Sequence, residues 1–177
     1  MTYSILYSSK SGNTKQLAET IHSTLLENKK EITGCFSIND SATTQEQLEI
    51  ISNASCIFIG FWTDKGICEE ALQKFLQTLE QKTIFLFGTA GFGGDDSYFD
   101  TILKRVSALC PTSNTIIGSF MCQGKMPPAV RNHYEQMKAQ NPTDGKWDTM
   151  IANFDSASSH PDTDDLNRLK EQIVSIL

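Results

Sequence analysis

Residues 8–14, Ser-Ser-Lys-Ser-Gly-Asn-Thr, concentrate hydroxyl side chains in one short stretch of the chain. This stretch follows an apolar run, Tyr3 to Tyr7, and leads directly into a helical pattern that contains Leu17 and Ile21. The first turn of a helix offers unpaired backbone N–H groups and roughly half a positive charge, and hydroxyls there can add hydrogen bonds to a phosphate dianion. The sequence therefore predicts a phosphate site made of Ser9, Lys10, Ser11, Gly12, Asn13 and Thr14.

Two common nucleotide motifs are missing from this stretch. It has no second Gly-Lys-Ser/Thr step, which excludes the loop of nucleoside triphosphate-binding proteins, and no G-x-G-x-x-G, which argues against a dinucleotide. An ordinary helix cap of Ser and Gly is the alternative interpretation. The position directly after the first apolar run favours the phosphate site.

Two further loops follow apolar runs. The loop 60–66, Gly-Phe-Trp-Thr-Asp-Lys-Gly, offers Trp62 as an aromatic wall, although a Trp can also fill the seam between a helix and a sheet. The loop 88–97 is rich in glycine, which permits positive φ angles and close approach of the backbone to a ligand. A flexible connector would have the same composition. With the first loop, these two define one candidate site.

Other chemistries lack their residues. His22, His133 and His160 are isolated from one another, and the five cysteines form no C-x-x-C pair, so no metal site is predicted. No G-x-S-x-G surrounds any serine of residues 8–14, which disfavours a hydrolase. We therefore predict no catalytic side chain.

Five runs rich in β-branched and aromatic residues predict strands at 3–7, 32–37, 56–61, 83–87 and 115–121. Segments with helical spacing separate them, and a last helix follows His160-Pro161-Asp162, with Pro161 in its first turn. Alternation of strand and helix indicates a doubly wound α/β domain with a parallel sheet, whose ligands lie at the carboxyl ends of the strands.

Length and charge limit the remaining possibilities. A chain of 177 residues predicts a single domain over 1–177, with residues 123–159 as a helix-containing appendage packed on one edge. The net charge of −6 argues against nucleic acid. No long apolar stretch or leader pattern is present, and the cysteines suit a reducing compartment, so we expect a cytoplasmic protein without a membrane span.

The segment Ser9-Lys10-Ser11-Gly12-Asn13-Thr14 after an N-terminal strand resembles the phosphate loop of flavodoxins, [TS]-x-[TS]-G-x-T. This resemblance implies a three-layer, five-stranded parallel sheet in the order 2-1-3-4-5, with FMN as cofactor. It also implies that the loops after strands three and four enclose the flavin ring. The residues that it assigns to the ring are Phe61, Trp62, Thr63, Asp64, Gly66, Thr89, Ala90, Gly91, Phe92 and Gly93.

The match to flavodoxins departs from the pattern at one point, and other motifs narrow the branch. No Tyr stands where flavodoxins usually carry a second aromatic, so Phe92 or Tyr98 is expected to cover the other ring face. Residues 120–126 and His160-Pro161-Asp162 resemble a branch of flavodoxin-like proteins frequent in anaerobic bacteria. One member type of that branch is the flavodoxin-like companion of bilirubin reductase.

The resemblance implies an FMN-binding electron carrier that shuttles electrons between redox partners. The partner is expected to be a reductase, a ferredoxin-type protein or a flavoenzyme with a basic docking face, attracted by Asp64, Glu69, Glu70, Asp95 and Asp96. Of these, Asp64, Asp95 and Asp96 are also expected to lower the reduction potential of the flavin, because negative charge disfavours its anionic reduced form. Two alternatives stay open: an FMN-dependent reductase of quinones or a small conjugated substrate, and a non-enzymatic module that binds another phosphate ligand.

Overall fold

The computed structural model describes residues 1–38 and 44–177, and its centre is a parallel five-stranded sheet in the order β2-β1-β3-β4-β5. The predicted α/β fold class and strand order are confirmed. The strands are β1 (Thr2–Tyr7), β2 (Glu31–Ser37), β3 (Cys56–Trp62), β4 (Thr83–Ala90) and β5 (Thr115–Gln123). The helices are α1 (Asn13–Glu27), α2 (Gln45–Asn53), α3 (Glu70–Leu76), α4 (Asp96–Ser107), α5 (Pro128–Gln140), α6 (Lys146–Ala157) and α7 (Thr163–Ser175).

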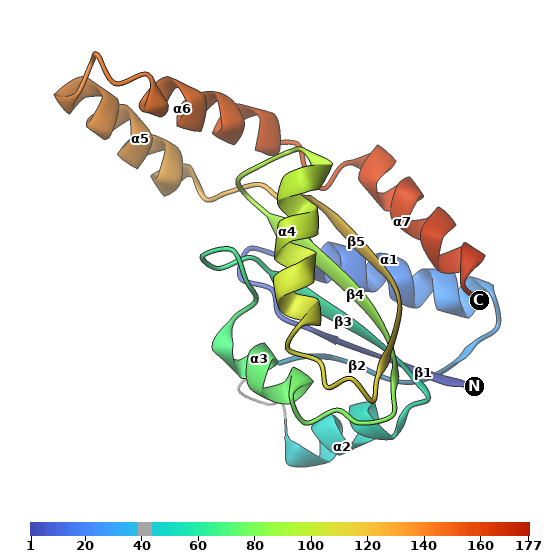
Figure 1. Ribbon diagram of the computed structural model, residues 1–177. Helices are drawn as coiled ribbons and strands as arrows, with labels where there is room; N and C mark the ends of the chain where they lie inside the picture. The colour runs from blue at the N-terminus through green and yellow to red at the C-terminus, as the bar shows by residue number, and fades with distance from the viewer. Residues whose placement is uncertain (39–43) are drawn as a thin grey trace.

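Helices cover both faces of the sheet and give the fold its three layers (Figure 1). Side chains of α2, α3 and α4 join one apolar cluster with Ile57, Ile59 and Phe61 of β3. Those of α1 and α7 join a second cluster with Phe58, from the opposite face of the same strand. A strand that is buried on both faces must be apolar at every position, which explains the continuous apolar sequence of β3.

The central strands β3 and β4 interlock near their carboxyl ends. Gly60 of β3 pairs with Phe87 of β4, and the next pair is Phe61 with Gly88. A side chain on either glycine would overlap the ring of its partner, so each ring lies flat across the glycine of the other strand. The next pair along, Trp62 with Thr89, stands at the mouth of the candidate site.

The last helix begins later than predicted. Pro161 was expected in its first turn, but this prediction was wrong, because Asp162 has extended backbone and acts as the N-cap of α7. Its carboxylate accepts the N–H of Asp165, while Asp165 accepts the N–H of Asp162, which completes a capping box. Pro161 therefore precedes the helix, after a cis peptide bond with His160.

The segment that was predicted to be an edge appendage contains α5 and α6, which pack against each other as a helical arm, residues 128–157. Figure 1 shows this arm projecting away from the sheet instead of lying along its edge. No residue of α5 is buried. Exposed ion pairs of Arg131 with Asp155 and of Lys138 with Asp148 cross from α5 to α6, and Arg131 also pairs with Glu135 within α5. Among the described residues, no helix has the length and hydropathy needed to cross a membrane.

Candidate functional site

A cavity of about 500 Å³ opens at the carboxyl ends of the strands, where a parallel doubly wound sheet binds its ligands. It brings together residues from all three loops that the sequence singled out. The predicted residues that line it are Lys10, Ser11, Asn13, Trp62, Thr63, Thr89, Gly91 and Phe92. A second hollow of about 380 Å³ shares Thr63, Gly91 and Phe92 with it, and adds Gly66 and Ala90 of the predicted set.

The hydroxyl-rich loop forms the open N-terminus of α1. Gly12 is the N-cap in the left-handed conformation, with φ of 88°, which only glycine adopts without strain. Gly12 has no side chain that could cap the helix, so among the described residues the N–H groups of the first turn meet a side-chain acceptor only at Lys15, and the positive end of the helix stays available to a ligand. Ser9 accepts the N–H of Lys15 at 3.2 Å and so braces the loop against the first turn. These features form the local geometry of an anion site.

Asn13 and Thr14 connect this loop to other strands. The Asn13 amide donates to Ser11 Oγ at 3.0 Å and to the carbonyl of Lys125 at 2.9 Å, while its own Oδ1 is buried and has no partner in the described part of the chain. Thr14 is fully buried, and its hydroxyl bonds that of Thr89 at 3.0 Å. Asn13 therefore lines the cavity, whereas Thr14 lies beneath it and ties α1 to β4.

Trp62 forms one wall of the cavity. Its indole N–H donates to the Glu69 carboxylate at 3.2 Å, which fixes the ring at one edge. The ammonium group of Lys10 lies 5.0 Å from the ring centroid, within the range of a cation–π interaction. A flat aromatic surface beside a helix N-terminus can receive a planar ligand that also carries an anion.

The rest of the strand-three loop is a tight turn. Asp64 and Ile67 exchange backbone hydrogen bonds at 2.8 and 3.1 Å, and Lys65 and Gly66 between them have φ of 50° and 83°. Two positive φ angles are typical of a type I′ hairpin turn. Asp64 does not line the cavity. Neither does Phe61, which is fully buried in the core because neighbouring residues of a strand point to opposite faces.

The strand-four loop presents Phe92 and Gly91 to the cavity. Phe92 is 42% exposed and packs edge-on against Tyr98 at 5.8 Å, so both candidates for the second aromatic lie at this loop. Gly93, with φ of 80°, does not line either hollow. Asp95 ends the loop as the N-cap of α4, and hydrogen bonds from the Ser97 hydroxyl and the Tyr98 N–H lower its pKa.

A fourth segment lines the cavity, and none of its residues was assigned to the flavin from the sequence; only the reductase alternative used the appendage as part of a pocket. It runs from the end of β5 to the arm and contributes Gly124, Lys125, Met126, Pro127 and Val130. The strand order carried a signal for it, because the carboxyl end of β5 must lie at the same edge as those of β3 and β4. Gly124 allows the close contact, since a side chain there would meet the Asn13 amide at 2.5 Å.

Charge at the cavity differs from the expected negative rim. The charged residues that line it are Lys10 and Lys125, and none of the five acids predicted to surround the ring is among the lining residues. Glu69 accepts the Trp62 N–H, and Glu70 pairs with Lys74 at 2.7 Å. Several of these acids therefore have structural partners of their own.

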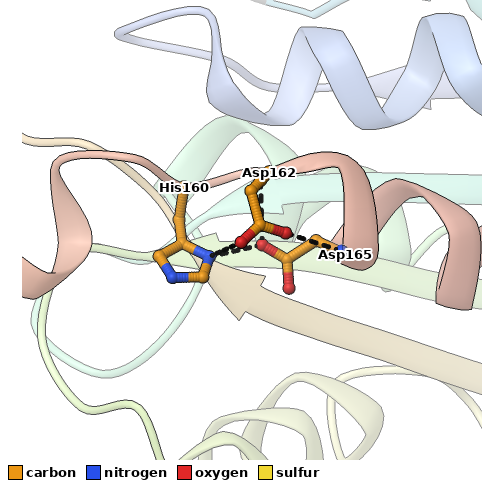
Figure 2. A group of neighbouring side chains, drawn as sticks. All are labelled: His160, Asp162 and Asp165. Atoms are coloured by element: carbon orange, nitrogen blue, oxygen red, sulfur yellow. Dashed lines mark hydrogen bonds and ion pairs between the residues drawn. The ribbon is translucent and has the colours of Figure 1, made fainter.

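Figure 2 shows His160, Asp162 and Asp165 gathered at the start of α7. Asp165 is 2% exposed; His160 Nδ1 lies 2.5 Å from its Oδ2, and Arg168 donates to its Oδ1 at 2.6 Å. Burial raises the pKa of Asp165, but the hydrogen bonds from His160, the Asp162 N–H and Arg168 outweigh burial, and the pKa is lowered. The sequence prediction of no metal site rested on the spacing of histidines and cysteines, and these carboxylate neighbours of His160 were outside it.

This cluster has the ligand types of a cation site, with ligand atoms within 4.8 Å of one another, yet its hydrogen bonds already engage both Asp165 oxygens. It also supports the candidate site through the main chain. The His160 carbonyl accepts the N–H of Lys125 at 2.8 Å, and the Lys125 carbonyl accepts from Asn13. The start of α7 thus holds the fourth segment against the start of α1.

The flavodoxin domain model matches residues 4–174 of this chain. A flavodoxin-like domain-containing protein BilS of Clostridium symbiosum is 36% identical over 99% of this chain and 95% of its own length. A BilS of Clostridioides difficile is 33% identical over 92% of this chain and 88% of its own.

Solved structures agree on the fold. Oxidised Flavodoxin 2 from Bacillus cereus has a TM-score of 0.59 at 14% identity, covering 99% of this chain and 97% of that one. A flavodoxin from the domain Archaea has a TM-score of 0.53 at 17% identity, covering 99% of this chain and 96% of that one. The protein therefore belongs to the flavodoxin domain family, in the branch of the BilS proteins.

Proposed function

We propose that this protein binds FMN without a covalent bond and carries electrons between redox partners. The observation that carries the proposal is the joining, in one cavity, of an uncapped helix N-terminus, a Trp wall and two lysines. A phosphorylated planar ring needs these three features together. Its membership of the flavodoxin domain family supports the same cofactor.

The residues present fit FMN at its phosphate end. Gly12 leaves the first turn of α1 open, with no atom within 4 Å of the position that a side chain would take. Lys10 and Lys125 add positive charge, and Ser11 adds a hydroxyl. Because charge-assisted hydrogen bonds are the stronger kind, these groups should select FMN over unphosphorylated riboflavin.

The residues also fit the ring end. Thr63 contributes a buried hydroxyl without a partner among the described residues, which can serve a polar ligand. Trp62 and Phe92 provide aromatic surface that excludes water. The cavity volume of about 500 Å³ lies within the range of about 300–1,000 Å³ that is typical of cofactor sites.

FMN supplies the electron transfer when it is bound, and the protein holds and tunes it. Among the described residues the cavity lining has two lysines and no acid, which favours an anionic reduced cofactor and so raises its potential. This is opposite in sign to the effect expected from the acids of the sequence. The exposed acids Asp95 and Asp96 lie beyond the lining residues and remain the proposed docking rim for a basic redox partner.

A flavin titration tests the proposal. The purified protein should be yellow. FMN should bind at least ten-fold more tightly than riboflavin, because riboflavin has no phosphate to make these contacts. Ser11→Ala should weaken FMN by about ten-fold and leave riboflavin unchanged. Equal affinity for the two flavins in the parent protein would contradict the phosphate site, and a colourless protein that binds neither would contradict the function.

One observation favours a reductase as the second candidate. One side of the cavity is apolar and is formed by Met126, Pro127 and Val130. Phe92 is exposed and also lines the adjoining hollow, so there is room for a small conjugated substrate. A reductase would oxidise a nicotinamide cofactor steadily in the presence of a quinone. A carrier would do so only when a separate reductase is supplied.

A further inference from the structure

Two amide side chains join the arm to the strand-four loop. Asn153 of α6 donates to the Gly91 carbonyl at 2.9 Å. Gln123, the last residue of β5, donates to the Gly93 carbonyl and to Asn153 Oδ1, the latter at 3.3 Å. The two amides therefore form one connected network with two carbonyls of the loop. We call this network the amide clamp.

The clamp has one consistent orientation. Each amide nitrogen faces an oxygen that can only accept, and the Asn153 oxygen faces the Gln123 nitrogen. If Asn153 were turned over, its oxygen would oppose the Gly91 carbonyl and its nitrogen would oppose another donor. Because Gln123 is only 8% exposed, water could not readily replace these bonds.

The clamp fixes the direction of two peptide groups in the loop. The C=O and N–H of a trans peptide lie in its plane and point in opposite directions. With the Gly91 and Gly93 carbonyls directed to the clamp, the N–H groups of Phe92 and Gly94 face the other way. Neither N–H forms a hydrogen bond within the described residues. Of these two residues Phe92 lines the cavity and Gly94 does not, so the Phe92 N–H is the backbone donor set in place for a ligand that presents acceptors, as the pyrimidine edge of a flavin does.

Without the clamp this loop would be hard to order. It contains Gly91, Gly93 and Gly94, and glycine loses more conformational freedom on ordering than any other residue. The segment that leads from β5 to the arm also covers the loop directly, since a side chain at Gly91 would meet Met126 at 2.5 Å. Fixing the loop in advance reduces the entropy lost when a ligand binds.

We propose that Asn153 and Gln123 are positioning residues for the flavin ring, and that through them the arm is part of the cofactor site. This inference rests on the proposed function. It assigns the arm a role that its exposed helix α5 does not reveal. The clamp acts on the ring and not on the phosphate, which separates its effects from those of the hydroxyl-rich loop.

The test uses the full chain with Asn153→Ala, and with Asn132→Ala as the matched control on the exposed surface of the same arm. Asn153→Ala should weaken FMN and riboflavin by the same factor, about three- to ten-fold, because one neutral hydrogen bond is lost. Asn153→Asp should weaken both flavins further, because a carboxylate oxygen then faces the Gly91 carbonyl. Asn132→Ala should change neither affinity.

A second measurement needs no flavin. Backbone NMR order parameters of residues 91–94 in the flavin-free protein should fall from near 0.85 to below about 0.6 in Asn153→Ala, while those of β4 stay unchanged. Thermal unfolding of each variant checks that it is folded. Unchanged order parameters, or a loss of affinity confined to FMN, would overturn the inference. Failure of the parent protein to bind either flavin would contradict the proposed function instead, with the order parameters still deciding the inference.

Discussion

Replacing Asp165 by Asn should destabilise the protein by about 2–3 kcal/mol at neutral pH, the value of a hydrogen bond to a charged group. The carboxylate is 2% exposed and accepts from Arg168 at 2.6 Å and from the Asp162 N–H at 3.1 Å, with His160 Nδ1 at 2.5 Å. The cost should stay below that of a fully buried ion pair, because the Arg168 side chain is 59% exposed and can be hydrated in the variant.

The effect of pH follows from the direction of the shift. The folded state lowers the pKa of Asp165, so the folded protein holds the charged form more strongly than the unfolded chain does. The stabilisation is therefore complete above the unfolded pKa of about 3.9 and is lost as pH falls through the lower folded pKa. The difference between parent and Asp165→Asn should be constant from pH 7 to about 5 and shrink towards pH 3.

Urea unfolding at several pH values between 3 and 7 measures this difference. Asp162→Ala is the control, because it removes a cap whose side chain is 39% exposed and should cost only about 1 kcal/mol. A cost for Asp165→Asn of less than about 0.5 kcal/mol at pH 7, well under one charged hydrogen bond, would refute the reasoning. So would a cost that does not change between pH 7 and pH 3.

Three other outcomes follow from the structure. FMN should quench the fluorescence of Trp62, so Trp62→Phe should remove most of the quenching, while Trp147, in the arm, retains its emission. Quenching that survives in Trp62→Phe would place the flavin ring elsewhere. Burial raises the pKa of Cys56 to about 11, so this thiol should resist alkylation at pH 8 until the protein unfolds, as mass spectrometry would show. Gly60→Ala should destabilise by about 1–3 kcal/mol in urea unfolding, because the added methyl overlaps the Phe87 ring; an unchanged midpoint would show that the ring can move aside.

Much of the fold could be predicted because its signals are local. The apolar sequence of β3 requires burial on both faces, and the helical spacing of Leu17, Ile21 and Leu25 places one side of α1 in the core. Strand ends were less certain: β4 continues to Ala90, three residues beyond the predicted Phe87. The segment from Gly88 to Ala90 stays in the sheet because it pairs with β5, which the sequence of β4 alone cannot show.

The site was harder to predict where it depends on distant contacts. Lys10 and Trp62 were visible because their loops follow recognisable strands. Met126 and Val130 carry no chemical signature, and they reach the cavity from the segment after β5 and from α5. The position of Phe61 could have been predicted from the sequence. Successive residues of a strand point to opposite faces, so Phe61 must face away from Trp62 and into the core. The partners of Glu69 and Asp165 depend on how side chains meet in space.

The crossed glycines and rings of β3 and β4 have a mechanical consequence for the site. Phe87 lies across Gly60 on one face of the sheet and Phe61 across Gly88 on the other, so neither strand end can slide or lift without disturbing both cores. Trp62 and Thr89 form the next pair along these two strands, so both site residues are attached to one rigid part of the sheet. A cofactor bound between the loops after β3 and β4 could gain or lose charge while the strand ends keep their positions. Any structural change in response to that charge would then be confined to the loops.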